Sequence, residues 1–153
     1  MILESRLLRW PDEDACAACA QALAARPALR DAHVALHGGL GAGKTTFVRH
    51  MLRALGVRGR IKSPTYTVLE PYDAQGLEIS HFDFYRFTDP REWEDAGFRE
   101  IFGRPGLKLA EWPEHAAGVL PPPDLDLRIE VGEDQTRLVR LDACTPRGVE
   151  LLP

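Results

Sequence analysis

One short segment of the chain combines the residue types that bind a polyphosphate. Gly38 to Thr45 fit the pattern G-x-x-x-x-G-K-(S or T), the phosphate-binding loop of P-loop nucleotidases. Glycines let successive backbone N–H groups turn towards one anion, because no Cβ stands in the way. In this pattern Lys44 bridges the β- and γ-phosphates and the Thr45 hydroxyl binds Mg²⁺. The residues that we predict to contact the nucleotide here are Gly39, Leu40, Gly41, Ala42, Gly43, Lys44, Thr45 and Thr46.

The sequence on either side of this loop has the periodicity that the pattern requires. Residues 32–36 are a short apolar run typical of a buried strand, and residues 45–55 carry apolar side chains at helical spacing. A helix in that position directs its positive end at the same anion. A glycine-rich turn without a ligand is the alternative, and the order of strand, loop and helix argues against it.

Two acidic residues follow apolar runs typical of strands, at the point where each run ends. Asp83 comes after residues 79–82, and Glu111 comes after residues 107–110. Ligands of open α/β sheets bind at the carboxyl ends of strands, and nucleotide hydrolysis needs carboxylates that hold Mg²⁺ and position water. We therefore predict Thr45, Asp83 and Glu111 as metal ligands and both acids as catalytic residues. Which acid holds the metal stays open, and for Asp83 as for Glu111 the alternative is a strand-end cap or surface acid.

Two further residues are candidates for the same site. Thr65 lies in a Ser-Pro-Thr loop, and we predict it as a catalytic, switch-like residue whose hydroxyl reaches Mg²⁺ or the γ-phosphate. The alternative is a simple turn in which the hydroxyl bonds nearby backbone. Trp112 follows Glu111 directly, and its indole either stacks near the nucleotide or packs in the core.

Length and composition fit a single globular domain over residues 1–153. No apolar run approaches membrane-spanning length and residues 1–14 lack a signal core, so we expect a cytoplasmic protein without membrane contact. Cys16 and Cys19 form a C-x-x-C pair, but one further cysteine is too few for a second pair of zinc ligands. We interpret the pair as small residues on the buried side of a helix, with a redox role as the alternative.

The charge distribution indicates which kinds of ligand or partner the chain could bind. No acidic residue lies between Asp31 and Glu70, which predicts either a positive face near a polyphosphate or RNA, or a solvated basic helix surface. Aromatic residues do not interleave with this basic stretch, and a net charge of −4 is unfavourable for a stand-alone nucleic-acid-binding protein. The chain contains no asparagine, so the N-K-x-D signature for guanine is absent and adenine is the favoured base.

The remaining elements follow from periodicity and turn residues. We expect strands near residues 2–8, 77–83, 107–111, 125–131 and 136–143, and helices at 13–25 and from Asp89 onwards. The segment at 63–69 should open as a loop and become β-rich. Asp89 would cap that helix, with Pro90 in its first position and Glu92 three residues after the cap. The last two strands alternate strictly, as in a hairpin at a sheet edge. The predicted fold is α/β of the P-loop NTPase type, with a mainly parallel central sheet, antiparallel strands at its margins and helices on both faces.

The motifs, in this order, resemble the TsaE family, the small P-loop ATPases of bacterial tRNA threonylcarbamoyladenosine synthesis. The resemblance covers nearly the whole chain. It rests on Gly38-Gly39-Leu40-Gly41-Ala42-Gly43-Lys44-Thr45-Thr46-Phe47-Val48-Arg49, Ser63-Pro64-Thr65-Tyr66, His81-Phe82-Asp83-Phe84-Tyr85-Arg86 and Glu111-Trp112-Pro113-Glu114. The first motif is common to many families, whereas the other three are far more specific.

The resemblance implies ATP and Mg²⁺ as cofactors, weak ATP hydrolysis by the chain alone, and TsaB and TsaD as partners. TsaD would transfer the carbamoyl group to adenosine, and the ATPase would reset that complex between turnovers, with tRNA contacted only indirectly. By motif, Lys44 binds phosphate, Thr45 ligates Mg²⁺, Asp83 and Glu111 are the acidic residues, Thr65 lies in a switch-like loop, and Trp112 falls beside the nucleotide. Gly39 stands where the family often has Asp, and Ala15-Cys16 where a Thr is expected.

Two other functions are compatible with the same residues. A P-loop kinase for a small metabolite would use lid arginines among Arg86, Arg91, Arg99 and Arg104, although the chain leaves little room for an acceptor domain. A nucleotide-dependent interaction switch would use ATP to order residues 63–67 and expose a docking surface, with negligible catalysis.

Overall fold

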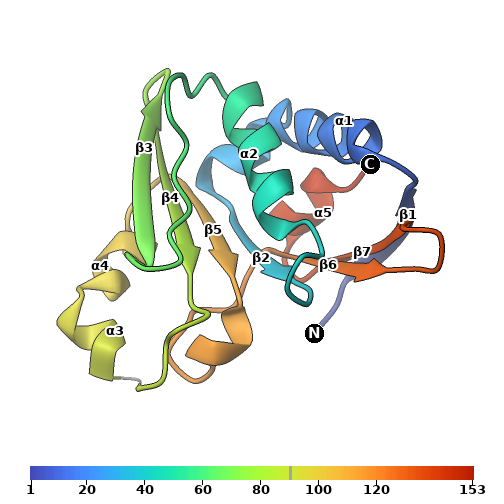
Figure 1. The fold of residues 1–153 in the computed structure, drawn as a ribbon. Coiled ribbons are helices and arrows are strands. Elements are labelled where there is room, and N and C mark those ends of the chain that lie inside the picture. The colour runs from blue at the N-terminus through green and yellow to red at the C-terminus, as the bar shows by residue number, and fades with distance from the viewer. Residues whose placement is uncertain (90) are drawn as a thin grey trace.

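The computed structural model describes residues 1–89 and 91–153, and within them the strands form one seven-stranded sheet (Figure 1). The strands are β1 (Glu4–Trp10), β2 (His33–His37), β3 (Leu69–Ala74), β4 (Leu77–Asp83), β5 (Leu107–Glu111), β6 (Leu125–Val131) and β7 (Arg137–Ala143). Their order across the sheet is β1-β7-β6-β2-β5-β4-β3. β2 therefore lies at the centre, and the glycine-rich loop leaves from its carboxyl end.

The sheet is mixed, with its parallel strands in the middle. β2 pairs in parallel with β5 and β6, and β4 pairs in parallel with β5. The pairs β3–β4, β6–β7 and β1–β7 are antiparallel. The predicted parallel centre with antiparallel margins is confirmed. The prediction that the β6–β7 hairpin forms a sheet edge is wrong, because β1 pairs with β7 along its full length and becomes the outer strand.

Helices lie on both faces of the sheet, as expected (Figure 1). The α-helices are α1 (Glu13–Ala24), α2 (Lys44–Ala54), α3 (Arg91–Asp95), α4 (Phe98–Gly103) and α5 (Pro146–Leu151), and the 3₁₀ helices are η1 (Pro27–Asp31) and η2 (Pro113–Ala116). α1 and α2 bury their apolar sides in the larger core, against side chains such as Leu109 and Leu127. α3 and α4 pack in a second, aromatic core on the opposite face, where Phe82 and Phe98 meet edge to face at 5.1 Å.

The two cores follow from the alternation of side chains along the strands. In β4, Ile79 points into the larger core and Phe82 into the aromatic one. Trp10, at the end of β1, stacks on Phe47 of α2 with ring centroids 5.6 Å apart, which ties the outer strand to the helix behind the glycine loop. Burying aromatic side chains of this size contributes strongly to stability, so the aromatic core holds the segment between β4 and β5 in place.

Several local predictions need correction. The segment at 63–69 opens as a loop, as predicted, but it does not become β-rich before its last residue: it continues as a turn with Val68 in the left-handed region at φ 67°, and β3 begins only at Leu69. The helix expected from Asp89 is divided into α3 and α4 at Gly97, which has φ 72°. The Asp89 carboxylate accepts a hydrogen bond from the Arg91 N–H at 2.9 Å, whereas Pro90 lies outside the described residues.

Other boundaries agree with the sequence. α1 begins directly after Asp12, whose side chain accepts a hydrogen bond from the Ala15 N–H, as an N-cap should. Gly56 follows the end of α2 at φ 100°, as expected of a residue that closes a helix. In the described part of the chain, the helices all fall short of the length and apolar character that a membrane span requires.

Candidate functional site

The glycine loop, residues 38–43, connects the carboxyl end of β2 to the first turn of α2. Gly38 has φ 154°, and a Cβ there would lie 2.8 Å from the Ile129 carbonyl oxygen, so the backbone passes too close for a side chain. Gly43 has φ 116° and precedes α2 without a side-chain cap. The first N–H groups of α2 therefore have no side-chain acceptor and are available to an anion bound at the glycine loop.

A cavity of about 270 Å³ opens in front of this loop. Its lining residues are Leu40, Gly41, Ala42, Gly43, Lys44, Thr45, Thr46, Thr65, Asp83, Tyr85, Glu111 and Trp112. The structure therefore brings together almost every residue that the sequence singled out. Gly39 contributes its carbonyl oxygen, which accepts a hydrogen bond from Lys44 Nζ at 3.0 Å.

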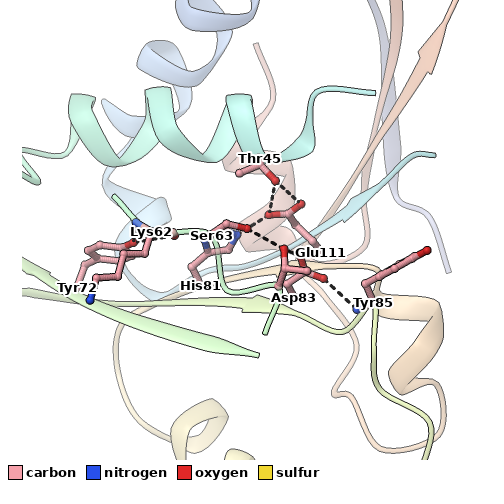
Figure 2. A network of polar contacts seen from close by, with 9 residues as sticks. Thr45, Lys62, Ser63, Tyr72, His81, Asp83, Tyr85 and Glu111 are labelled. Atoms are coloured by element: carbon pink, nitrogen blue, oxygen red, sulfur yellow. Dashed lines mark hydrogen bonds and ion pairs between the residues drawn. The ribbon is translucent and has the colours of Figure 1, made fainter. Parts of the chain in front are cut away.

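The two acids lie side by side because of the sheet register. Asp83 ends β4, Glu111 ends β5, and the two residues are partners in the parallel ladder. Both are nearly inaccessible, with 5% and 2% of their surfaces exposed. Thr45 Oγ1 donates to Glu111 Oε1 at 2.9 Å and lies 3.2 Å from Oε2, as Figure 2 shows. A hydroxyl group and two carboxylates thus face one another at the start of α2.

The Lys44 side chain folds back over its own loop. Its Nζ donates to the carbonyl oxygens of Gly38 and Gly39 and lies 4.1 Å from the centre of the Trp112 ring. Burial lowers the pKa of Lys44, although the nearby charge of Glu111 opposes that shift. Trp112 has φ 55°, an uncommon conformation for a bulky residue, and this backbone directs its ring towards the lysine.

Asp83 is held by the segments before and after it. Its Oδ1 accepts from the Tyr85 N–H at 2.9 Å (Figure 2). Its Oδ2 lies 3.4 Å from Thr65 Oγ1. Burial raises the pKa of Asp83, and the neighbouring Glu111 charge adds to the shift, while the Tyr85 N–H opposes it. Thr65 also pairs with Ser63 at 2.8 Å, so the loop hydroxyls form a short chain that ends on the carboxylate.

Sequence reasoning missed two residues of this site: Tyr85, which lines the cavity, and His81. His81 is fully buried, and its Nε2 lies 2.6 Å from Glu111 Oε2. It precedes Asp83 by two positions in β4, so the period of two places both on the same sheet face. That spacing was the available signal.

A second cavity, of about 330 Å³, adjoins the first behind the glycine loop. It is lined by Trp10, Pro11, Asp12, Glu13, Cys16, Ala42, Gly43, Thr46, Gln135 and Arg137. Ala42, Gly43 and Thr46 line both cavities. Arg137 Nε donates to the Ala42 carbonyl oxygen at 3.2 Å and so connects the β6–β7 hairpin to the loop.

Cys16 and Cys19 are free thiols in α1, Cys16 buried and Cys19 half-buried. Burial raises the pKa of Cys16 to about 12, with the neighbouring Cys19 adding to the shift, and burial raises the pKa of Cys19 to about 11. A raised pKa disfavours the thiolate, the form of cysteine that acts as a nucleophile and as a metal ligand. No group of three or more His, Cys, Asp or Glu side chains in residues 1–89 and 91–153 is arranged to hold a metal.

Comparison with known proteins agrees with the resemblance found in the sequence. The family model described as "Threonylcarbamoyl adenosine biosynthesis protein TsaE" matches residues 10–139, which include the glycine loop, both acids and Trp112. The chain belongs to the TsaE family. The matched region of the TsaE model leaves out most of β1 and the whole of α5.

Individual relatives support the same family. The chain is 44% identical to the "tRNA threonylcarbamoyladenosine biosynthesis protein TsaE" of Haemophilus influenzae over 119 residues, which cover 78% of this chain and 75% of that protein. It is 37% identical to the protein of the same name from Bacillus subtilis over 108 residues, 71% of this chain and 67% of that protein. The crystal structure of Bacillus subtilis YdiB superposes with a TM-score of 0.81 at 27% identity, covering 99% of this chain and 93% of that one.

Proposed function

We propose that this chain is a Mg²⁺-dependent ATPase that serves the tRNA threonylcarbamoyladenosine pathway. The observation that carries the proposal is the convergence of Thr45, Asp83 and Glu111 beside the glycine loop, around one cavity. Phosphate and a hard cation need this combination of backbone N–H groups, a lysine and carboxylate oxygens. The names of the family and of its relatives supply the pathway.

The donor atoms suit magnesium. Mg²⁺ is typically bound through one or two carboxylates together with substrate phosphates and water. When bound, it would neutralise charge that develops on the phosphates. The Thr45 hydroxyl already donates a hydrogen bond to Glu111. Its oxygen keeps a lone pair that can bind a cation while this hydrogen bond is maintained. We therefore assign the metal to Thr45 and Glu111, with Asp83, the ladder partner of Glu111, as the second carboxylate that lines the cavity.

Lys44 and the glycine loop would bind the phosphates. A phosphate oxygen is a stronger partner for an ammonium group than a neutral carbonyl, so it would compete with the Gly38 and Gly39 carbonyls for Lys44 Nζ. The first N–H groups of α2 would add donors on the same side. Trp112 would then flank the phosphate-binding lysine.

The second cavity gives the nucleoside a place to bind. It shares Ala42, Gly43 and Thr46 with the phosphate side, so one extended ligand can occupy both cavities across the loop. Its walls include the Trp10 ring and the Arg137 side chain. Because the chain has no asparagine for a guanine signature, we propose adenine as the base.

Asp83 and Thr65 would act on the attacking water. Asp83 keeps an oxygen that bonds the Thr65 hydroxyl, and Thr65 belongs to a loop that can respond to the γ-phosphate. A carboxylate in this position accepts a hydrogen bond from water and orients it towards phosphorus. The loop also reaches the segment after β4, since the Arg86 guanidinium lies 4.5 Å from the centre of the Tyr66 ring.

Coupling to partners completes the proposal. The family resemblance points to TsaB- and TsaD-type proteins, whose carbamoyl-transfer cycle the ATPase would reset, with tRNA contacted only indirectly. Hydrolysis would then be slow in the isolated chain and faster with the partners. A purely nucleotide-dependent switch differs in one measurable respect, because partners would leave its hydrolysis rate unchanged.

The test of this function is ATP binding and turnover with and without Lys44. We expect Lys44→Ala to abolish nucleotide binding measured by calorimetry, because the phosphates lose their only lysine in the cavity. Glu111→Gln and Asp83→Asn should retain binding and lose at least about 10²-fold in turnover, the scale of a lost electrostatic group in an active site. Wild-type hydrolysis by Lys44→Ala would overturn the phosphate-site assignment, and transfer of phosphate to a metabolite would identify a kinase.

A further inference from the structure

A buried histidine lies behind the metal site without belonging to it. His81 is fully buried in β4, and its Nε2 contacts Glu111 Oε2 at 2.6 Å. Within the described residues, its other ring nitrogen, Nδ1, has no hydrogen-bond partner. Burying an imidazole away from water costs free energy unless its nitrogens are hydrogen-bonded. Among residues 1–89 and 91–153, the hydrogen-bond partner of this costly side chain is Glu111.

The contact divides the two oxygens of Glu111 between different partners. A carboxylate only accepts hydrogen bonds, so in the metal-binding form of Glu111 the donor to Oε2 is His81 Nε2. Thr45 Oγ1 is nearest to Oε1, at 2.9 Å. His81 from β4 and Thr45 from α2 thus hold the carboxylate from two sides (Figure 2). Without His81, Oε2 would lose its donor and the glutamate side chain would regain rotational freedom.

We propose that His81 is a positioning residue, which fixes the Glu111 carboxylate so that Oε1 meets a divalent cation at Thr45. The inference rests on the proposed function, and it adds a residue that orients a metal ligand without binding the metal itself. Groups that hydrogen-bond a metal ligand orient it and raise its affinity, and their loss typically weakens metal binding by about 10–100-fold. His81 acts through Glu111 and touches neither nucleotide nor metal.

A packing role makes a different prediction from a positioning role. His81 shares its sheet face with Ile79, a member of the larger core, so an apolar side chain such as leucine suits the position by volume. If His81 only filled space, leucine would serve as well as histidine. If it donates to Glu111, glutamine should serve better than leucine, because its amide N–H can reach a similar position.

The experiment measures Mn²⁺ binding by electron paramagnetic resonance in the complex of the full chain with ADP. We expect His81→Leu to weaken Mn²⁺ binding about 10–100-fold and His81→Gln to recover most of that loss. ADP affinity in EDTA should match wild type in both variants, because the phosphate-binding loop is untouched. A matched control is His33→Leu: His33 is also buried, but it packs edge-on against Phe102 at 4.9 Å in the opposite core, and it should bind Mn²⁺ like wild type.

Two results would overturn the proposal. Mn²⁺ affinity of His81→Leu within twofold of wild type would show that Glu111 needs no support. An equal loss in His81→Leu and His81→Gln would assign the effect to packing. Should the leucine variant fail to fold, His81→Ala takes its place in the same titration. If wild type itself does not bind Mn²⁺ with ADP, the proposed function fails and the positioning role fails with it, whereas normal binding by wild type and by His81→Leu removes only the positioning role.

Discussion

Three buried ionisable side chains line the same cavity at the carboxyl end of the parallel strands. Lys44, Asp83 and Glu111 each expose 5% of their surface or less, and burial disfavours the charged forms of the lysine and of Asp83. Trp112 adds a backbone conformation that bulky residues rarely adopt. Such features persist only where the surrounding structure enforces them, and they cluster at functional sites. The residues that would bind the ligand are therefore not those that best stabilise the fold.

Asp83→Asn tests whether a residue that the function needs reduces the stability of the fold. The substitution removes a buried charge whose pKa burial has raised, so we expect a stability gain of about 1 kcal/mol, within the usual range for such changes. In a chain of this size that corresponds to roughly 2–4 °C in Tm, measured by circular dichroism without nucleotide. Turnover should be lost in the same variant. A lower Tm would contradict the idea that this charge opposes folding.

The gain from Asp83→Asn should depend on pH. Because the pKa of Asp83 in the folded protein lies above its ordinary value of 3.8, the folded state binds this proton more tightly than the unfolded state. Wild type therefore loses stability relative to the variant as pH rises from 3.8 through the raised pKa. The Tm difference should be larger at pH 7 than near pH 4, and an unchanged difference would rule out the charge as its cause.

Secondary-structure elements fix the site through their ends. The parallel register of β4 and β5 makes Asp83 and Glu111 neighbours, and α2 begins where Thr45 can reach Glu111. At the opposite end of the sheet, α5 anchors the start of β6. Thr145 Oγ1 accepts from the Gly148 N–H at 3.1 Å and donates to Asp124 Oδ1 at 2.7 Å. The helix packs so closely there that its glycine has no room for a methyl group.

Gly148→Ala should therefore destabilise the chain without harming the site. An added Cβ would lie 1.9 Å from the Asp124 carbonyl oxygen, so the backbone must move, at a cost of about 1–3 kcal/mol. Urea unfolding measures the loss, and ATP affinity should stay unchanged because the substitution is at the far end of the strands. Gly103→Ala is the matched control, since nothing lies within 4 Å of its added Cβ, and it should stay within about 0.5 kcal/mol of wild type.

Across the whole molecule, the candidate site joins segments that are far apart in the sequence. The first cavity is bounded by the glycine loop, Thr65 and the ends of β4 and β5, and the second by the N-terminal turn and the β6–β7 hairpin. A ligand that spans both would connect two parts of the sheet. Binding of the ligand would then raise the free energy of unfolding of the entire chain.

Mg²⁺ and ADP should raise the stability of the whole chain. At a hundredfold excess over Kd the expected gain is about 2.7 kcal/mol, or roughly 5–10 °C in Tm for this length. Differential scanning fluorimetry with and without EDTA separates the metal from the nucleotide. Lys44→Ala should show no shift, and an equal shift in that variant would mean that the ligand binds elsewhere.

Sequence alone was sufficient where the determinants are local. The residues of the glycine loop have a fixed spacing, and the apolar runs before Asp83 and Glu111 show where each strand ends. The position of both acids at the carboxyl end of the sheet, beside the loop, was therefore predictable. The second cavity was not predicted, because its walls come from residues near 10–16, 42–46 and 135–137, and no periodic pattern links them. The loop that opens at Ser63 was predicted, but its length was not, because its contacts with Asp83 and Arg86 are non-local.

The outer strands of the sheet bear on how this protein resists aggregation. β1 carries Glu4, Arg6 and Arg9, and β3 contains Pro71, which has no N–H to donate. Charged side chains and proline on outer strands discourage a second copy from adding its own strand there. Association with other proteins would then proceed through helices or sheet faces, and at high concentration these outer strands would disfavour growth of the chain edge to edge into fibrils.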